Sequence, residues 1–124
     1  METVIVNKTE VDRVASFLLA NQIVCFPTET VFGLAVVADD YASYLRLIEC
    51  KNRPINKAFP LLVDRYEALA RYAKVNARSK QIIERYLPGP LTLIMPKRET
   101  IPAYVTAGQS QIAIRWSDDP FVQA

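Results

Sequence analysis

Two threonines and a glutamate follow the first strongly apolar segment of the chain, at the point where a strand is expected to end. Thr28, Glu29 and Thr30 come directly after Pro27, which closes the apolar run at 23–26. Ligands bind at the carboxyl ends of strands in open layered sheets, and a threonine hydroxyl can both donate and accept a hydrogen bond. The segment therefore predicts contacts to a small polar ligand, with an ordinary turn capped by threonine as the alternative.

A second candidate is a cluster of cations. Lys51, Arg53 and Lys57 lie within the seven positions 51–57, beside Pro54, whose ring limits the freedom of the backbone. Arginine offers a planar fork for phosphate oxygens and lysine offers a point charge. The cluster can bind a triphosphate through its side chains, and the same residues also fit the solvated end of a helix.

The third candidate is Arg115, which lies between Ile114 and Trp116 in an apolar segment. An arginine within a strand is rarely left unpaired, because burying an isolated charge is costly. Its guanidinium can hold a substrate carboxylate through two hydrogen bonds, or it can pair with an internal aspartate or glutamate. The residue types leave both interpretations open.

Alternating strand and helix patterns position these side chains. Strands are predicted at 4–6, 23–26, 60–63, 91–95 and 111–116, with a further apolar run at 31–38. Helices are predicted after Thr9, after Asp39 or Asp40, at 64–73, at 77–87 and after Asp119, with Lys51 and Arg53 in the last turn of the second. The alternation indicates an α/β or α+β domain with a mixed sheet.

Two further motifs are expected to serve the architecture. The segment 87–93, with Pro88, Gly89 and Pro90, reads as a rigid corner that leads into a strand. The tyrosines of the predicted helices are expected to pack in the core rather than to form a platform for stacked bases. They are Tyr41, Tyr44, Tyr66, Tyr72 and Tyr86.

Several kinds of chemistry are excluded by composition. The chain contains no histidine, which rules out histidine triads and histidine zinc sites. Its three glycines lie far apart, so neither a dinucleotide-binding fingerprint nor a P-loop is present. Cys25 and Cys50 stand alone in apolar segments and are expected to be reduced core residues. No cluster of carboxylates announces a metal site.

Length, charge and hydropathy point to one ordinary domain. The 124 residues are 51% hydrophobic with a net charge of +2, which is enough apolar material for a core and too little charge to indicate nucleic-acid binding by itself. The apolar runs are too short to span a membrane, and the acidic amino terminus does not resemble a secretory leader. These features favour a cytoplasmic protein with no membrane association.

The motifs occur in an order that resembles the threonylcarbamoyl-AMP synthase family, the Sua5/YciO/YrdC group. The matching stretches are FPTETVFGL at 26–34, KNRP at 51–54 with Lys57, LPGPLTL at 87–93, VTAG at 105–108, IAIR at 112–115 and DP at 119–120. Each stretch is moderately specific, and together they span nearly the whole chain. The resemblance implies a twisted, open mixed β-sheet flanked by helices, with a concave positive cavity.

The resemblance also implies a reaction, in which L-threonine, bicarbonate and ATP form threonylcarbamoyl-adenylate and pyrophosphate. The product serves the formation of N6-threonylcarbamoyladenosine in tRNA. By this resemblance Lys51 and Arg53 contact the nucleotide phosphates and act in catalysis, and Lys57 also binds the nucleotide. Thr28 and Arg115 lie at the substrate threonine, Mg²⁺ accompanies ATP, and a threonylcarbamoyl-transferase complex is a downstream partner.

The chain departs from the family pattern in two places. Asp64 stands where many relatives carry a histidine that touches the substrate threonine. The later Ser-x-Asn motif of the family is absent, and the capped helix predicted after Asp119 has about one turn. We therefore expect residues 1–124 to form a single domain of this type that lacks its C-terminal part.

Two other functions are consistent with these observations. A non-catalytic module could use the same positive cavity to bind a nucleotide, tRNA or double-stranded RNA. A shortened domain could also act as an interaction partner through an unpaired sheet edge. Salt-sensitive RNA binding without adenylate formation would distinguish the first of these from a synthase, and concentration-dependent oligomerisation would support the second.

Overall fold

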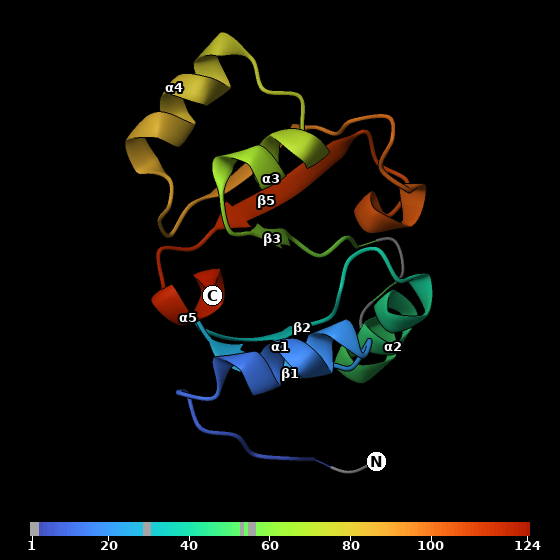
Figure 1. Ribbon diagram of the computed structural model, residues 1–124. Coiled ribbons are helices and arrows are strands. Elements are labelled where there is room, and N and C mark those ends of the chain that lie inside the picture. Colours follow the sequence, from blue (N-terminus) through green and yellow to red (C-terminus); the bar gives the residue numbers. More distant parts are fainter. Residues whose placement is uncertain (1–2, 29–30, 53, 55–56) are drawn as a thin grey trace.

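Two β-sheets form the framework of the computed structural model, which describes residues 3–28, 31–52, 54 and 57–124 (Figure 1). The first sheet is a two-stranded antiparallel hairpin of β1 (Val24–Pro27) and β2 (Phe32–Ala35). The second has the strand order β3-β5-β4 and contains β3 (Leu61–Val63), β4 (Thr92–Pro96) and β5 (Gln111–Trp116). Because β3 runs parallel to β5 and β4 runs antiparallel, the predicted mixed sheet is confirmed.

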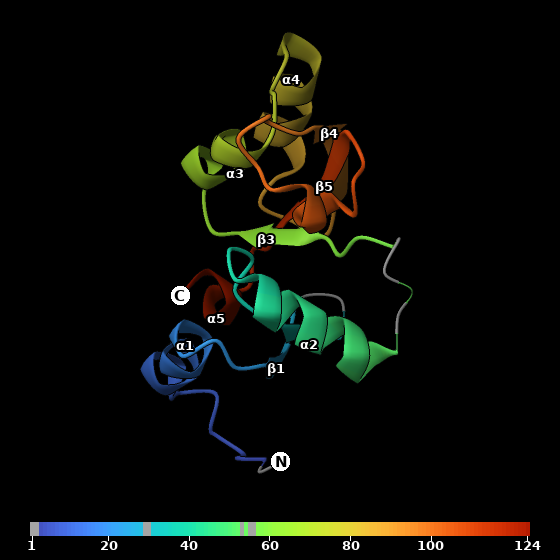
Figure 2. The same cartoon turned by 90° about the vertical axis from the view of Figure 1, so that its right-hand side faces the viewer.

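Helices are divided between the two sheets, which gives the molecule two lobes (Figures 1 and 2). We call them the hairpin lobe, which contains β1 and β2, and the three-stranded lobe. The hairpin lobe carries α1 (Val11–Leu19), α2 (Tyr41–Lys51) and α5 (Pro120–Gln123). The three-stranded lobe carries α3 (Tyr66–Tyr72), α4 (Ala77–Tyr86) and the 3-10 helix η1 (Ala103–Thr106).

The larger hydrophobic cluster lies in the three-stranded lobe. Leu69 of α3 and Ile114 of β5 are fully buried, and Ile83 of α4 and Ile112 of β5 are 2% exposed. Alternate residues of a strand point to opposite faces of the sheet. Ile112 and Ile114 therefore face α3 and α4, whereas Arg115 points to the other face. The packing of α3 and α4 thus fixes which face presents the arginine.

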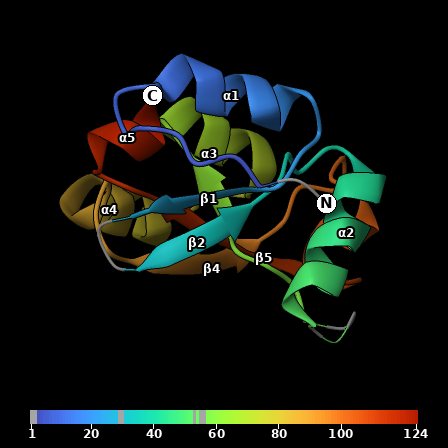
Figure 3. The same ribbon diagram turned by 90° about the horizontal axis from the view of Figure 1, so that it is seen from below.

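A smaller cluster holds the hairpin lobe together. Val14 of α1 packs with Val24 and Phe26 of β1, and α5 contributes Phe121 and Val122. The ring centroids of Phe26 and Phe121 are 6.0 Å apart. Since α5 directly follows β5 in the sequence, this contact ties the two lobes together (Figure 3).

Helix boundaries follow the capping chemistry of the sequence. Asp40 begins α2 by accepting a hydrogen bond from the Ser43 N–H at 3.0 Å, and Asp119 begins α5 by accepting one from the Phe121 N–H at 2.8 Å. The predicted cap at Asp119 is confirmed, and of the two candidates Asp39 and Asp40 it is Asp40 that caps α2. At the amino end, Glu10 rather than Thr9 precedes α1, so the predicted cap at Thr9 is wrong.

The predicted corner at 87–93 is also confirmed. The Gly89 N–H donates to the Trp116 carbonyl oxygen at 2.9 Å, which fastens the corner to the end of β5. A side chain at position 89 would meet the Tyr86 carbonyl oxygen at 2.5 Å. Only glycine therefore fits this close approach of two backbone segments.

Other sequence predictions are corrected by the structure. Residues 4–6 form no strand, and Ile5 is 93% exposed, because the described residues provide no neighbouring strand for this segment. The run at 23–26 is buried on one face only. Cys25 points outward between Val24 and Phe26, and both Cys25 and Cys50 are free but exposed. Their predicted place in the core is wrong.

The apolar stripes of two helices differ from those predicted. In α2 the buried positions are Ser43, Tyr44 and Leu47. Two tyrosines predicted to pack in the core are substantially exposed, Tyr41 at 50% and Tyr86 at 53%. The sequence pattern locates these helices but misplaces the buried face, because tertiary neighbours decide which side of a short helix is covered.

Candidate functional site

Thr28 follows β1 and takes part in the turn that leads to β2. Its hydroxyl donates to the Val31 carbonyl oxygen at 2.6 Å and accepts from the Val31 N–H at 3.2 Å. The Thr28 N–H also donates to the Val31 carbonyl oxygen, at 3.1 Å. The turn-capping role considered in the sequence analysis is confirmed, whereas ligand binding by Thr28 stays a prediction. Glu29 and Thr30 lie outside the described residues.

Lys51 occupies the last turn of α2, as predicted. Asn52 caps the end of the helix: its N–H donates to the carbonyl oxygens of Ile48 and Glu49, and its left-handed backbone (φ 50°) turns the chain out of the helix. Lys51 is exposed, and its Nζ lies 5.3 Å from the centroid of the Phe59 ring. Cations are favoured both over an aromatic face and at a helix carboxyl end. This ammonium group is therefore held near the chain that leaves α2.

The rest of the cation cluster is described in part. Lys57 is exposed, and its N–H donates to the Pro54 carbonyl oxygen at 3.1 Å, which turns the chain toward β3. The prediction for Arg53 lies outside the described residues. Lys51 thus ends α2, and Lys57 lies on the connection from α2 to β3.

Aromatic rings link this connection to η1. The Phe59 ring meets Tyr44 edge-on at 5.8 Å, and Tyr44 packs on Tyr104 at 5.3 Å. Tyr41 packs on Tyr104 at 4.8 Å, and the Tyr104 hydroxyl donates to the Ala38 carbonyl oxygen at 2.8 Å. The sequence analysis missed Phe59 and Tyr104, since no spacing rule connects residues that meet only when the chain folds back.

Two titratable groups beside this aromatic cluster have displaced pKa values. The hydroxyl and N–H of Ser43 donate to the carboxylate of Asp40 and lower its pKa, and Arg46 acts in the same direction. Burial raises the pKa of Tyr104, and the charges of Asp39 and Asp40 add to the rise. Asp40 is therefore kept ionised at the start of α2, and Tyr104 is kept neutral as a hydrogen-bond donor.

Arg115 lies on the side of the three-stranded sheet that α3 and α4 leave uncovered. Its register partners are Thr92 on β4 and Leu62 on β3. Leu62 is 39% exposed, and Ile94, on the same face, is 66% exposed. Arg115 itself is half-buried. The structure thus places Arg115 on this face of the sheet with its Nε atom buried, and its binding of a carboxylate stays a prediction.

The predicted site residues fall into two groups. Thr28 and Arg115 stand near the carboxyl ends of β1 and β5, which α5 joins through the contact between Phe26 and Phe121. Lys51 lies at the carboxyl end of α2 and Lys57 on the connection that follows it, and Figure 1 shows α2 and α5 on opposite sides of the hairpin lobe. A ligand that reaches both groups must extend along this lobe.

Two cavities among the described residues lie elsewhere, in the three-stranded lobe. One of about 260 Å³ is lined by Tyr66, Lys80, Ile83, Glu84, Leu87 and Trp116. The other, of about 460 Å³, is lined by Ile82, Tyr86, Pro90, Leu91 and Leu93. Neither cavity is lined by any of the predicted site residues.

Within the described ranges, no three histidine, cysteine, aspartate or glutamate side chains form a group that could hold a metal ion. Among the helices of the described residues, none is both long and apolar enough to cross a membrane.

The mixed sheet with helices, together with the motifs on its strands, defines an α/β protein of the YrdC-like class. The Sua5/YciO/YrdC family model, described as "Telomere recombination", matches residues 16–124. The chain therefore belongs to the Sua5/YciO/YrdC family. The resemblance found in the sequence and the YrdC-like fold class are both confirmed.

Individual relatives agree with this assignment. The threonylcarbamoyl-AMP synthase of Pyrococcus abyssi is 36% identical over 102 residues, covering 82% of this chain and 30% of the relative. That of Photobacterium profundum is 35% identical over 114 residues, covering 90% and 62%. The crystal structure of P. abyssi Sua5 complexed with L-threonine superposes with a TM-score of 0.88 at 30% identity, covering 97% of this chain and 36% of that one. The chain thus spans less than two thirds of these relatives.

Proposed function

We propose that this chain is a threonylcarbamoyl-AMP synthase domain, which converts L-threonine, bicarbonate and ATP to threonylcarbamoyl-adenylate and pyrophosphate. The observation that carries the proposal is the similarity of nearly the whole chain to Sua5, in a structure that was determined with L-threonine. Curated relatives at 35–36% identity carry the name threonylcarbamoyl-AMP synthase. The site residues named below are part of the same proposal.

Nucleotide binding is assigned to the cation cluster. Lys51, Arg53 and Lys57 neutralise the triphosphate, and Arg53 supplies a fork of donors for phosphate oxygens. The ring of Phe59, 5.3 Å from the Lys51 Nζ, supports this role because it holds the ammonium close to the connection that carries the other two cations. Mg²⁺ arrives with ATP and takes its ligands from phosphate oxygens and water.

Threonine binding is assigned to the other group. Arg115 holds the carboxylate of L-threonine through two hydrogen bonds, and Thr28 contacts the same substrate. The half-buried position of Arg115 supports this role, because a charge-assisted hydrogen bond is stronger where water is partly excluded. Asp64 follows β3 at the position where many relatives have a histidine, so threonine selectivity depends on Arg115 and Thr28 to a larger extent.

The chemistry suits a site without histidine. The threonine amine and bicarbonate combine with loss of water to form a carbamate, whose oxygen attacks the α-phosphorus of ATP as pyrophosphate leaves. The carbamate is already anionic, so the attack needs no general base. Charge builds on the phosphate oxygens, where Lys51 and Arg53 stabilise it. Positioning of the two reactants supplies much of the remaining rate.

The product needs an acceptor. We propose that the threonylcarbamoyl group passes to the adenosine beside the anticodon of tRNA, with a threonylcarbamoyl-transferase complex as the downstream partner. We therefore propose that the protein acts in the cytoplasm, together with the tRNA and that complex. Binding of tRNA or double-stranded RNA in its own right is the alternative to catalysis.

The test measures pyrophosphate release with ATP, bicarbonate and labelled L-threonine, and detects the adenylate by mass spectrometry. It uses this chain and, beside it, a chain extended to the length of the curated relatives. We expect product that requires all three substrates. No product and no ATP binding by the extended chain would overturn the proposal, and salt-sensitive tRNA binding without adenylate would assign the RNA-binding alternative instead.

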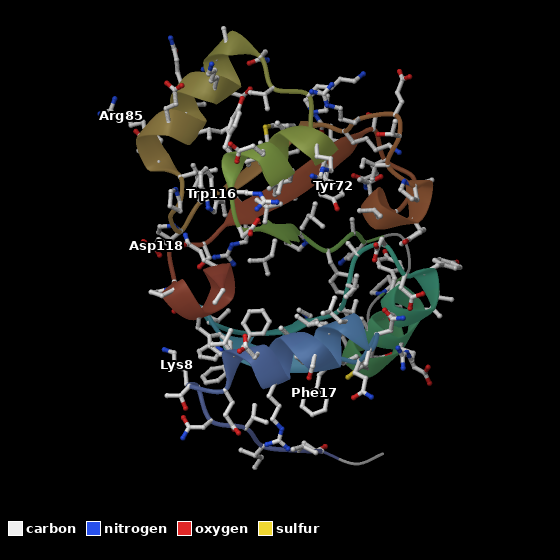
Figure 4. All side chains as sticks on the ribbon, viewed as in Figure 1. Lys8, Phe17, Tyr72, Arg85, Trp116 and Asp118 are labelled. Atoms are coloured by element: carbon white, nitrogen blue, oxygen red, sulfur yellow. The ribbon has the colours of Figure 1, made fainter. Side chains whose placement is uncertain are left out.

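Variants separate the two groups of residues. Arg115→Ala is expected to raise the KM for threonine at least tenfold with little change in ATP binding. Lys51→Ala is expected to weaken ATP binding and leave threonine binding nearly unchanged. Lys8→Ala, an exposed lysine of the hairpin lobe (Figure 4), is the matched control and should change neither. Equal losses of both ligands in both variants would contradict these roles.

A further inference from the structure

The strand β4 lies at the edge of the three-stranded sheet, with β5 on one side only. The Lys97 N–H donates to the Ser110 carbonyl oxygen, just beyond the end of β4. Because every second residue of an antiparallel strand directs its N–H and C=O to the same neighbour, the backbone groups of Met95 and Leu93 also point to β5. The backbone groups of Thr92 and Ile94 therefore point away from β5. Among the described residues, no strand pairs with them. Within the described part of the chain, Thr92 and Ile94 thus have no backbone partner for their outward donors and acceptors.

The same edge is used a few residues further on. The Pro96 carbonyl oxygen accepts from the Lys74 N–H at 2.8 Å, and the Arg98 N–H donates to the Tyr72 carbonyl oxygen at 3.0 Å. These bonds are on the outer side, like those offered by Thr92 and Ile94. These two bonds surround the isolated bridge between Ala73 and Lys97, so the outer side of the chain is already paired where β4 ends.

Between Leu91 and Met95 the strand carries no charge to protect its edge, and proline occurs only at its end, at position 96. The segment 91–95 contains no charged residue, although natural edge strands commonly carry lysine or an inward-pointing charge to prevent pairing. Ile94 is 66% exposed on one side of the strand. Prolines at positions 90 and 96 limit an added strand to a few residues.

A groove runs beside this edge on the other side of the strand. Ile82 and Tyr86 of α4 face Leu91 and Leu93 across a space of about 460 Å³, with Pro90 at one end. None of these residues is charged, and the Tyr86 ring is 53% exposed. A strand added to β4 would turn every second side chain into this groove, which is how strand addition obtains specificity.

The charges around the groove select the partner. Arg78 lies one turn before Ile82 on the same side of α4, and the Arg85 guanidinium stands 5.5 Å from the centroid of the Tyr86 ring. Figure 4 shows Arg85 on the outer side of α4. Glu84 lines the other cavity, together with Lys80. The charge beside the groove is therefore positive.

We propose that β4 and α4 form a docking site for an extended segment of a partner protein, in which apolar and acidic side chains alternate. The backbone of the segment pairs with Thr92 and Ile94, its apolar side chains enter the groove, and its carboxylates meet Arg78 and Arg85. A second copy of this chain is a poorer occupant. Pairing of two β4 edges would bring the arginines of both α4 helices to one side of the joined sheet, where they repel one another.

The test uses a fluorescein-labelled peptide that alternates valine with glutamate, and a second peptide with lysine in place of glutamate. Fluorescence anisotropy with the full chain is expected to show binding of the acidic peptide that weakens with salt, and at least tenfold weaker binding of the basic one. Equal binding of the two peptides, or no binding of the acidic one, would overturn the proposal.

Variants test the backbone and the charge separately. Ile94→Pro removes an outward N–H without touching a bond to β5, and should weaken binding about tenfold. Ile94→Val keeps the N–H and should bind as the unchanged chain does. Arg85→Glu should reverse the preference between the peptides. Leu19→Glu, at an 81% exposed site on α1, is the control for a new surface charge and should have no effect.

Two results would contradict the proposed docking of an acidic partner on β4. Undiminished binding by Ile94→Pro, with an unchanged circular dichroism spectrum, would exclude strand addition. A concentration-dependent dimer in sedimentation that Ile94→Pro dissolves would assign the edge to a second copy and overturn the acidic partner.

Discussion

The two lobes bury their apolar residues to different extents. In the three-stranded lobe, β5 lies between two strands and beneath two helices, and Ile114 is fully buried there. The hairpin lobe has a sheet of two strands, whose buried residues are held by one face of α1 and the single turn of α5. A two-stranded hairpin is marginal by itself. The hairpin lobe therefore depends on the helices and on its tie to the other lobe.

The comparison bears on the proposed function. Arg115 is carried by the well-packed lobe, and Thr28, Lys51 and Lys57 are carried by the hairpin lobe or by the connection that leaves it. Stability is not uniform across a fold, and sites that bind and release ligands often use its less stable segments. We expect ligand binding to order the hairpin lobe more than the three-stranded lobe.

The largest expected loss of stability comes from a substitution in the core of the three-stranded lobe. Ile114→Ala removes a fully buried side chain from the central strand and should lower the free energy of unfolding by about 2–5 kcal/mol. Urea denaturation followed by circular dichroism measures it. Ile5→Ala, at a 93% exposed position, is the control and should change little. Equal effects of the two variants would show that β5 is not the centre of the core.

A smaller and more local effect is expected at the tie between the lobes. Phe121→Ala removes the ring that lies 6.0 Å from Phe26 and should cost about 1–2 kcal/mol. Hydrogen exchange should accelerate in β1 and α1 but not in β4 and β5, because only the hairpin lobe loses packing. Phe32→Ala, at a 72% exposed ring, is the control. Uniform acceleration in both lobes would contradict their separate stability.

Local signals in the sequence predicted the positions of most elements. The strand predicted at 111–116 is β5, and the caps at Asp40 and Asp119 are found where their short side chains indicated. These features depend on neighbours in the sequence. The wrong predictions depend on neighbours in space. Val4 is β-branched, but no strand of the described ranges pairs with it, and Cys25 alternates outward in a run that looked fully apolar.

The site was predictable to a similar extent. Lys51 stands in the last turn of α2, as its position in the sequence indicated. Its contact with Phe59 and the ring of Tyr104 beyond it could not be predicted, since they meet only through the reversal of the chain after α2 and the return of η1. The sequence position of Lys51 predicted its place on the helix, but it did not predict which side chains surround it.

A moderate effect is expected where η1 contacts the chain before α2, through the hydrogen bond from Tyr104 to Ala38. Tyr104→Phe removes the hydrogen bond to the Ala38 carbonyl oxygen and should cost about 1 kcal/mol. Because burial raises the pKa of Tyr104, its contribution to stability is complete below its ordinary value of 10.0 and is lost as the pH rises above it. Thermal melts from pH 8 to 11 should therefore fall less steeply in Tyr104→Phe. Tyr86→Phe, at an exposed ring, should keep the original slope.

The smallest effect is expected at the start of α2, and it sharpens the contrast because the capping hydrogen bond lies within the hairpin lobe. Asp40→Ala removes the carboxylate that accepts from Ser43 and should lower the melting temperature slightly at neutral pH. The pKa of Asp40 is lowered, so its contribution is present above the ordinary value of 3.8 and is lost as the pH falls through the lower folded value. Asp40→Asn keeps a capping oxygen without a titrating proton, and it should be less sensitive to acid than the unchanged chain. Asp39→Ala is the control, and an acid response equal to that of Asp40→Asn would remove Asp40 from this role.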